Sequence, residues 1–306
     1  PPRSTLFPYT TLFRSLVKPE NGARSWINLG VTKAQPSELA KISYVLAVAW
    51  YLRFRKNHRR FLGLLTPAVI TAVPVGLITL QPDLGTACLF VPALFAMLVA
   101  AGARLKHLAI VVCLAGLAAP AVYPILLPHQ KARIVGLIRQ AQGDKSFDQD
   151  INMQTATARR LIAAGGTAGV GDAKSRALVR FNGLPERHND MVFAVVVNRF
   201  GLAGGLAVVG LYGLWIAGAL LTSGLSREPF GRLTVIGLAA FVSGQAFINI
   251  GMNLGVLPII GITLPFVSYG GSSLVTMWVM TGLVYAVAVR PPKPPMRPSF
   301  EHFDDD

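Results

Sequence analysis

Long apolar stretches separated by short basic links dominate this chain. Seven stretches approach the roughly 20 apolar residues that a membrane-spanning helix needs. They cover about 36–52, 61–80, 84–103, 108–127, 191–222, 233–256 and 272–289. A polar segment, 128–190, separates the fourth stretch from the fifth. The pattern therefore predicts an all-α polytopic membrane protein with one large loop.

Basic residues in the links predict the orientation of these spans. The sequence RFRKNHRR at 53–60 and the cations at 104–107 lie between apolar stretches, and the positive-inside rule places such links in the cytoplasm. The loop 128–190 is then extracytoplasmic. The Pro-rich end of the chain, 291–306, begins with basic residues and is expected to be a disordered cytoplasmic tail.

Composition agrees with a membrane protein. Of the 306 residues, 52% are hydrophobic and only 14% are charged, against roughly a quarter charged in soluble domains. We attribute the net charge of +15 mainly to topology and predict no nucleic-acid partner, because the apolar runs leave no room for a soluble nucleic-acid domain. Cys88 and Cys113 lie inside apolar runs, so we expect small buried hydrophobic side chains rather than a disulfide or a metal pair.

The first fifteen residues, PPRSTLFPYTTLFRS, differ from the rest. They lack the sustained apolar core that a signal peptide places behind a basic start. We expect a non-native leader at 1–15 and a membrane domain over 16–290.

Charged residues near the outer ends of the spans are candidate functional groups, because a charge inside a membrane is costly. Glu38 and Lys41 stand three residues apart on one helical face and can pair, as part of a site or as a structural ion pair. Asp83 lies in a tight link between two spans, where it could instead be a helix N-cap.

Asp190, in LPERHNDMVFAV, lies where the polar loop meets the fifth span. An acid in the first turn of a helix is stabilised by about 0.3–1 kcal/mol, which alone would leave it a weak base. If the helix begins at Pro185, Glu186 and Asp190 share one face, and their repulsion would raise the pKa of one carboxyl and make a better general base. The residues alone leave both alternatives open.

The loop itself is strongly basic. Ten cations within it suggest an anionic ligand, with attraction to lipid headgroups as the alternative. The segment 151–164 has an apolar stripe at Ile151, Ala158, Leu161 and Ile162, which predicts a helix lying on the membrane surface. The second irregular segment, LPIIGITLPFVSYGGSS at 257–273, would be tolerated at membrane depth only where it is buried or lines a wet cavity.

Five motifs together resemble the SEDS family (shape, elongation, division and sporulation), whose best-known members are RodA and FtsW. The motifs are NGARSWINLG with QPSELAK at 21–41, QPDLGTA at 81–87, HQKARI at 129–134, LPERHNDMVFAV at 184–195 and NIGMNLGVLPIIGITLPFVSYGGSS at 249–273. Arg187 makes the fourth motif more similar to RodA than to FtsW.

The resemblance implies a fold of ten transmembrane helices in the bacterial cytoplasmic membrane, with the active site on the extracytoplasmic face. The seven stretches would then be the last seven helices, and the chain would be incomplete at its N-terminus.

The resemblance also implies a peptidoglycan glycosyltransferase, which polymerises lipid II during cell elongation together with a class B penicillin-binding protein. Asp190 matches the catalytic acid of the family and would act as the general base. The matching substrate-binding positions are Glu38, Lys41, Asp83, Arg133, Glu186, Arg187 and Ser268. A divalent cation, Mg²⁺ or Mn²⁺, could assist the departing pyrophosphate.

The sequence departs from the family at two places. Asn198 and Arg199 stand where an acidic pair is usual, and Ser25 stands where an Arg often precedes the Trp, with Arg24 one place earlier. Other functions remain compatible with the residues: a lipid II flippase, an FtsW-like division polymerase, or a scaffold that only recruits the penicillin-binding protein.

Overall fold

The computed structural model describes residues 27–28, 33–55, 60–81, 83–125, 131, 135–136, 153–184 and 187–290. The predicted leader and tail lie outside these residues, as do Arg24, Ser25, Arg133 and Glu186.

The regular secondary structure of the described residues is helical apart from an antiparallel pair of two-residue strands, β1 (Ile27–Asn28) and β2 (Lys33–Ala34). Its helices are α2 (Pro36–Phe54), η2 (Leu62–Leu64), α3 (Leu65–Leu80), α4 (Leu84–Ala100), α5 (Leu105–Val122), η3 (Tyr123–Ile125), α7 (Met153–Gly165), α8 (Asp172–Phe181), α9 (Val192–Leu225), α10 (Pro229–Leu254) and α11 (Gly271–Val289). The all-α prediction is confirmed, and each predicted apolar stretch contains one long helix.

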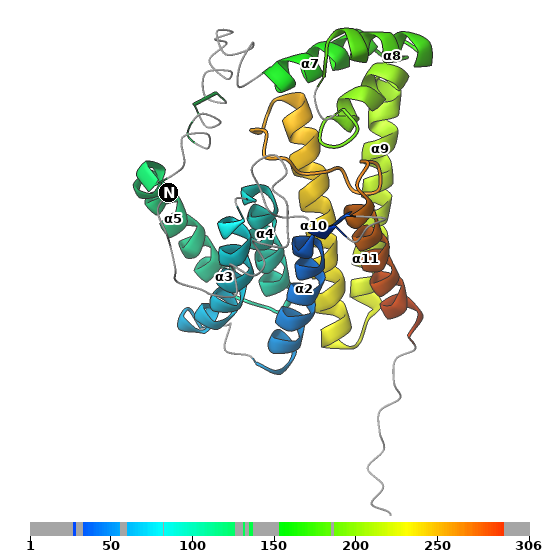
Figure 1. Ribbon diagram of the computed structural model, residues 1–306. Helices are drawn as coiled ribbons and strands as arrows, with labels where there is room; N and C mark the ends of the chain where they lie inside the picture. The colour runs from blue at the N-terminus through cyan, green and yellow to red at the C-terminus, as the bar shows by residue number, and fades with distance from the viewer. Residues whose placement is uncertain are drawn as a thin grey trace, which may run out of the picture.

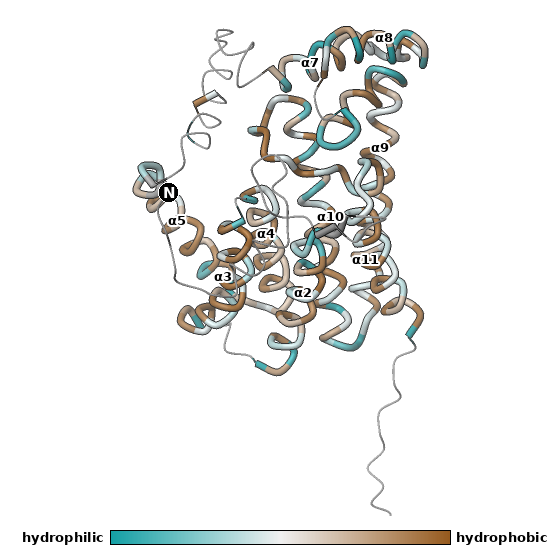
Figure 2. The backbone as a smooth tube through the Cα atoms, viewed as in Figure 1, coloured by the Kyte–Doolittle hydropathy of each residue, from teal (hydrophilic) through white to brown (hydrophobic). Residues whose placement is uncertain are grey.

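Four of the described helical segments are long and apolar enough to cross a membrane by length and composition: 62–80, 192–225, 229–254 and 271–289. Leu84–Ala100 and Leu105–Ala118 are shorter apolar helices. The tube coloured by hydropathy shows these helices as mostly brown, while teal segments gather at α7 and α8 (Figure 2).

Helix α10 is the central element of the bundle and packs against α2, α4, α9 and α11 (Figure 1). Tyr44, Phe90 and Phe241 bring α2, α4 and α10 together, with ring centroids 4.9–6.1 Å apart. A Cβ on Gly237 would lie 2.7 Å from a Val45 side-chain carbon and 2.8 Å from the Met97 sulfur. Small residues that permit such close approach are what hold membrane helices together, since lipid is as apolar as the helix surfaces.

The cysteines are not buried as expected. Cys88 and Cys113 are both free thiols and both exposed on the outside of the bundle. An apolar run in a membrane protein has a lipid-facing side as well as a core side, so an apolar context alone did not fix their burial.

Helix α7 lies across the outer end of the bundle together with α8 (Figure 1). The prediction that its apolar stripe faces the membrane surface is wrong. Ala158 and Leu161 are 0% and 1% exposed, and they pack in one cluster with Met191 and Ala194 at the start of α9. An apolar stripe can be buried against lipid or against protein, and here it packs against the start of α9.

Helix α9 is broken at Gly201, which has φ 71° and ψ −167°. The turn that follows α7, 165–171, fits into this break. Val170 and Gly171 donate backbone N–H groups to the carbonyls of 198 and 199, and 202 and 203 donate to the carbonyls of 166 and 167, at 2.9–3.4 Å. A Cβ on Gly201 would lie 2.3 Å from the Thr167 carbonyl oxygen. The break leaves helix-end groups unpaired, and the turn pairs them, so α7 and the start of α9 are held together.

Candidate active site at the start of α9

Asp190 lies in the turn that precedes α9, whose N-cap is Met191. The helix therefore does not begin at Pro185, and the condition for placing Asp190 one helical turn after Glu186 is not met. Asp190 is partly buried, and the next residue, Met191, packs in one cluster with Ala158 and Leu161 of α7.

The backbone of this turn is held by an unusually complete set of donors. The carbonyl oxygen of His188 accepts the Tyr269 N–H at 2.8 Å. That of Asn189 accepts the Ser268 hydroxyl at 2.6 Å. These carbonyls precede the helix, and the irregular segment after α10 donates hydrogen bonds to both of them.

The carbonyl oxygen of Asp190 accepts two hydrogen bonds from α10. The side-chain amides of Asn249 and Asn253 each donate to it at 2.9 Å. Asn253 also accepts the Ala194 N–H at 3.1 Å through its amide oxygen, and Asn249 donates to the Ile262 carbonyl at 2.6 Å. Both asparagines are 0% exposed.

The segment between α10 and α11, 255–270, passes beside the Asp190 carboxylate. A Cβ on Gly261 would lie 3.6 Å from Asp190 Oδ2, and Gly261 is exposed with φ 73°. Phe266, with φ 62°, lies with its ring centroid 6.2 Å from Trp215 and 5.8 Å from Trp278. A bulky residue in the left-handed region is uncommon; here packing between α9 and α11 holds it, and the Tyr212 hydroxyl donates to the Pro265 carbonyl. The sequence predicted that this irregular segment is buried or lines a wet cavity; Ile262, Leu264 and Ser268 are buried, whereas Gly261 and Tyr269 are exposed.

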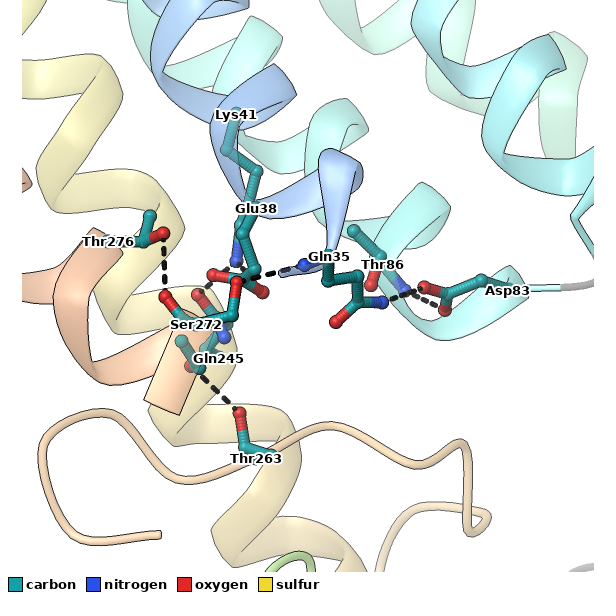
Figure 3. A network of polar contacts seen from close by, with 10 residues as sticks. Gln35, Glu38, Lys41, Asp83, Thr86, Gln245, Thr263, Ser272 and Thr276 are labelled. Atoms are coloured by element: carbon teal, nitrogen blue, oxygen red, sulfur yellow. Dashed lines mark hydrogen bonds and ion pairs between the residues drawn. The ribbon is translucent and has the colours of Figure 1, made fainter. Parts of the chain in front are cut away.

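A second polar network lies deeper in the bundle (Figure 3). Lys41 Nζ lies 2.8 Å from Glu38 Oε1 and 3.1 Å from the Gln245 side-chain oxygen. Lys41 is 0% exposed and Glu38 is 4% exposed. Glu38 Oε2 is buried and accepts no hydrogen bond within the part of the chain that is described. The predicted pair therefore exists as a buried ion pair within α2, and the hydrogen bond from Lys41 to Gln245 joins it to α10.

Asp83 is the N-cap of α4, and its Oδ1 accepts the Thr86 N–H at 3.0 Å. Its Oδ2 accepts the Gln35 side-chain amide at 3.1 Å, and the Gln35 backbone N–H donates to Ser272 Oγ at 3.1 Å. Figure 3 shows these residues beside the ion pair, at the ends of α2, α4 and α11. Asp83 is therefore the helix N-cap that the sequence offered as one alternative. It also accepts a hydrogen bond from Gln35, which directly precedes α2.

Helix α10 carries both networks on one face. Gln245, Asn249 and Asn253 follow at intervals of four residues, which stacks their side chains. Sequence reasoning did not single out these three amides. Their signal was available, because amides repeated every four residues in the apolar stretch that follows Arg232 need buried hydrogen-bond partners.

The other predicted residues have internal contacts. Arg187 Nε donates to His188 Nε2 at 3.2 Å, which places its side chain next to the Asp190 turn. Ser268 is 9% exposed, and its hydroxyl also accepts the Leu264 N–H at 2.7 Å, so both of its contacts support the loop.

The two unusual residues on α9 contact the α7–α8 region. Asn198 is 0% exposed and donates to the Leu161 carbonyl at 2.8 Å. Arg199 lies 3.0 Å from Asp172, which also pairs with Arg176. The positive charge of Arg199 therefore has an acidic partner within the chain.

No three His, Cys, Asp or Glu side chains come together among the described residues. What they do present is one carboxylate, held through its backbone, at the outer end of a membrane bundle. Such a group can accept a proton from a substrate hydroxyl that reaches it.

Residues 6–291 match the FtsW/RodA/SpoVE family of cell cycle proteins. Among curated relatives, the chain is 34% identical over 273 residues to a protein of Thioalkalivibrio sulfidiphilus and 30% identical over 273 residues to one of Bacillus subtilis, both named "Probable peptidoglycan glycosyltransferase FtsW". These matches cover 87% of this chain and 66% and 67% of the relatives, so the chain spans about two thirds of their length.

Two solved structures are also similar to this chain. A chain from a peptidoglycan synthase complex that coordinates polymerization and crosslinking is 33% identical, with a TM-score of 0.76 over 91% of this chain and 77% of that one. The rod shape determining protein RodA of Thermus thermophilus is 29% identical, with a TM-score of 0.59 over 91% of this chain and 74% of that one.

Proposed function

The chain belongs to the FtsW/RodA/SpoVE family, and from this membership we propose that it is a peptidoglycan glycosyltransferase that polymerises lipid II into glycan strands. The observation that carries the proposal is the backbone-held carboxylate of Asp190 at the outer end of the bundle, beside the exposed Gly261. Relatives named as peptidoglycan glycosyltransferases and a similar chain from a peptidoglycan synthase complex support it.

In the proposed reaction, Asp190 is the general base. Its carboxylate takes the proton from the 4-hydroxyl of the acceptor GlcNAc, and that oxygen forms a bond to the anomeric carbon of the donor MurNAc. The bond from the anomeric carbon to the pyrophosphate oxygen breaks, and undecaprenyl pyrophosphate leaves with the electron pair. A positioned base contributes about 10²–10⁴-fold to such a step.

Placing the acid at the membrane surface suits a lipid-linked substrate. The isoprenoid can stay in the bilayer while the sugars reach the turn at 187–191 on the extracytoplasmic face of the cytoplasmic membrane. Arg187 lies next to Asp190 and would help to neutralise the departing pyrophosphate. Arg133 and Glu186 stay proposals from the sequence alone, as does the assignment of Glu38, Lys41, Asp83 and Ser268 to substrate binding.

The proposed partner is a class B penicillin-binding protein that cross-links the new strands, as the similar synthase-complex chain suggests. We assign the chain to cell elongation on the RodA-like Arg187. A division role is the second candidate, since the relatives named FtsW are 30–36% identical and the Thermus thermophilus RodA is 29% identical.

The test reconstitutes the protein with its penicillin-binding partner and lipid II, and compares wild type with Asp190→Ala and Asp190→Asn. We expect both variants to lose about 10²–10⁴-fold in glycan synthesis. Asp172→Asn is the matched control, because Asp172 is an exterior acid that pairs with Arg176 and Arg199 and not with the Asp190 turn.

Unchanged glycan chain length and rate in both Asp190 variants would remove Asp190 from the reaction. If wild type makes no polymer while lipid II crosses the vesicle bilayer, the protein is a flippase instead.

A further inference from the structure

The backbone of Asp190 is held by side chains that lie far from it in the sequence. Asp190 lies in the turn before α9, and side chains of a neighbouring element donate hydrogen bonds to its carbonyl oxygen. The side chains that reach this oxygen belong to α10, 59 and 63 residues further along the chain.

We propose that Asn249 and Asn253 are positioning residues that hold the backbone of Asp190, and with it the base of its side chain, in place for glycosyl transfer. This inference rests on the proposed role of Asp190 as the base. The two amides act through the backbone of Asp190 and are not themselves in contact with the reacting atoms.

The geometry shows why two amides are needed. A carbonyl oxygen has two lone pairs, and the two Nδ2 donors, each at 2.9 Å, occupy both. One donor would leave the peptide plane free to rotate about that bond, whereas two donors from different turns of α10 fix it. Because Cα of Asp190 lies in this peptide plane, the two hydrogen bonds fix the backbone position from which its side chain extends.

Asn253 adds a second constraint. Its amide oxygen accepts the Ala194 N–H in the first turn of α9 at 3.1 Å, while its nitrogen donates to Asp190. A single side chain therefore fixes the turn relative to the helix that follows it. Asn249 links the same oxygen to Ile262, in the segment that passes the Asp190 carboxylate.

Apolar side chains would fill these buried positions without needing hydrogen-bond partners. A buried amide costs free energy unless it is fully hydrogen-bonded. Two amides that are both 0% exposed and both donate to one carbonyl oxygen therefore indicate a role in positioning that backbone group. A displacement of about 1 Å at a reacting group can cost about 100-fold in rate.

The experiment uses the full-length protein with its partner and lipid II. Asn249→Leu and Asn253→Leu replace each amide with an apolar side chain of similar size. We expect kcat to fall about 10–100-fold while KM for lipid II stays within about 3-fold. Asn198→Leu is the matched control, because Asn198 is also 0% exposed and donates one hydrogen bond, to Leu161.

The control separates position from stability. If the Asn198→Leu protein melts as far below wild type as the other two but keeps kcat within about 3-fold, loss of a buried amide alone does not explain the slow reaction. If the leucine variants do not fold, Asn249→Ser and Asn253→Ser take their place. A serine at these positions can bond the carbonyl four residues earlier, as Ser243 does at 2.6 Å, but is too short to reach Asp190.

The inference is overturned if folded Asn249 and Asn253 variants keep kcat within about 3-fold of wild type, or if only KM rises. The two proposals fail separately. Normal polymerisation by Asp190→Ala would remove the base and with it the reason to position it. Loss of activity in Asp190→Ala with full activity in the asparagine variants would remove the positioning role alone.

Discussion

Two acidic sites lie along the same face of α10, and they are held in opposite ways. Glu38 is fixed through its side chain, by Lys41 at 2.8 Å inside the bundle. Asp190 is fixed through its backbone, with three consecutive carbonyls, 188–190, each accepting a hydrogen bond from α10 or from the segment that follows it. Gln245 serves the first site, and Asn249 and Asn253 serve the second.

The difference separates structural charge from candidate catalytic charge. A buried acid that is paired with a lysine is already neutralised, and its stability depends on keeping that partner. The hydrogen bonds that anchor Asp190 here are made to its peptide group. The first arrangement is an ion pair that supports the fold, and the second holds the carboxylate that we propose as the base.

Breaking the ion pair should give the largest loss of stability. Lys41→Met leaves Glu38 buried without its cation, and we expect a cost of about 3–5 kcal/mol in the free energy of unfolding. The double variant Glu38→Gln with Lys41→Met should recover most of it, because no uncompensated charge remains. Unfolding in detergent by denaturant measures both, and a single variant that costs under about 1 kcal/mol would contradict the comparison.

Removing one anchor of the Asp190 turn should have an intermediate effect. Ser268→Ala leaves the buried Leu264 N–H and the Asn189 carbonyl without the hydroxyl that both contact, and we expect a cost of about 1–3 kcal/mol together with slower glycan synthesis. Ser223→Ala is the control, since Ser223 is also buried but its only described bond is 3.4 Å long, to Arg232. Equal rates in the two variants would mean that the Ser268 anchor does not serve the site.

The smallest effect is expected at the surface pair. Arg199 and Asp172 are each 41% exposed at the side chain, and exposed ion pairs contribute about 0.2–1 kcal/mol. Arg199→Ala should therefore shift the unfolding midpoint little and leave glycan synthesis unchanged, since Asp172 keeps Arg176. A large loss of synthesis would show that this cation, unusual for the family, takes part in function.

Much of the fold followed from local patterns. Apolar stretches of membrane length became helices because backbone groups in lipid must be paired within the segment. The spacing of Glu38 and Lys41 gave their pairing, since residues three apart share a helical face. Asp83 directly precedes an apolar helix, and Asp favours the N-cap position there because its side chain accepts a backbone N–H of the first turn.

Other features depended on distant partners. The apolar stripe of α7 indicated burial but not against what, and its partner proved to be α9. The break at Gly201 is stable because the turn at 165–171 pairs the freed backbone groups, and nothing in the local sequence of α9 predicts that turn. The exposure of Cys88 and Cys113 likewise depended on which side of each helix met the bundle.

The sequence by itself therefore determined that this is a helical membrane protein with its candidate acid at Asp190, because span length, charge placement and motif are read along the chain. Only the tertiary structure decided how that acid is held. Its anchors, Asn249, Asn253 and Ser268, lie 59, 63 and 79 residues away from the groups that they bind. Hydrogen bonds over such separations exist only once α10 and the following segment have packed against the start of α9.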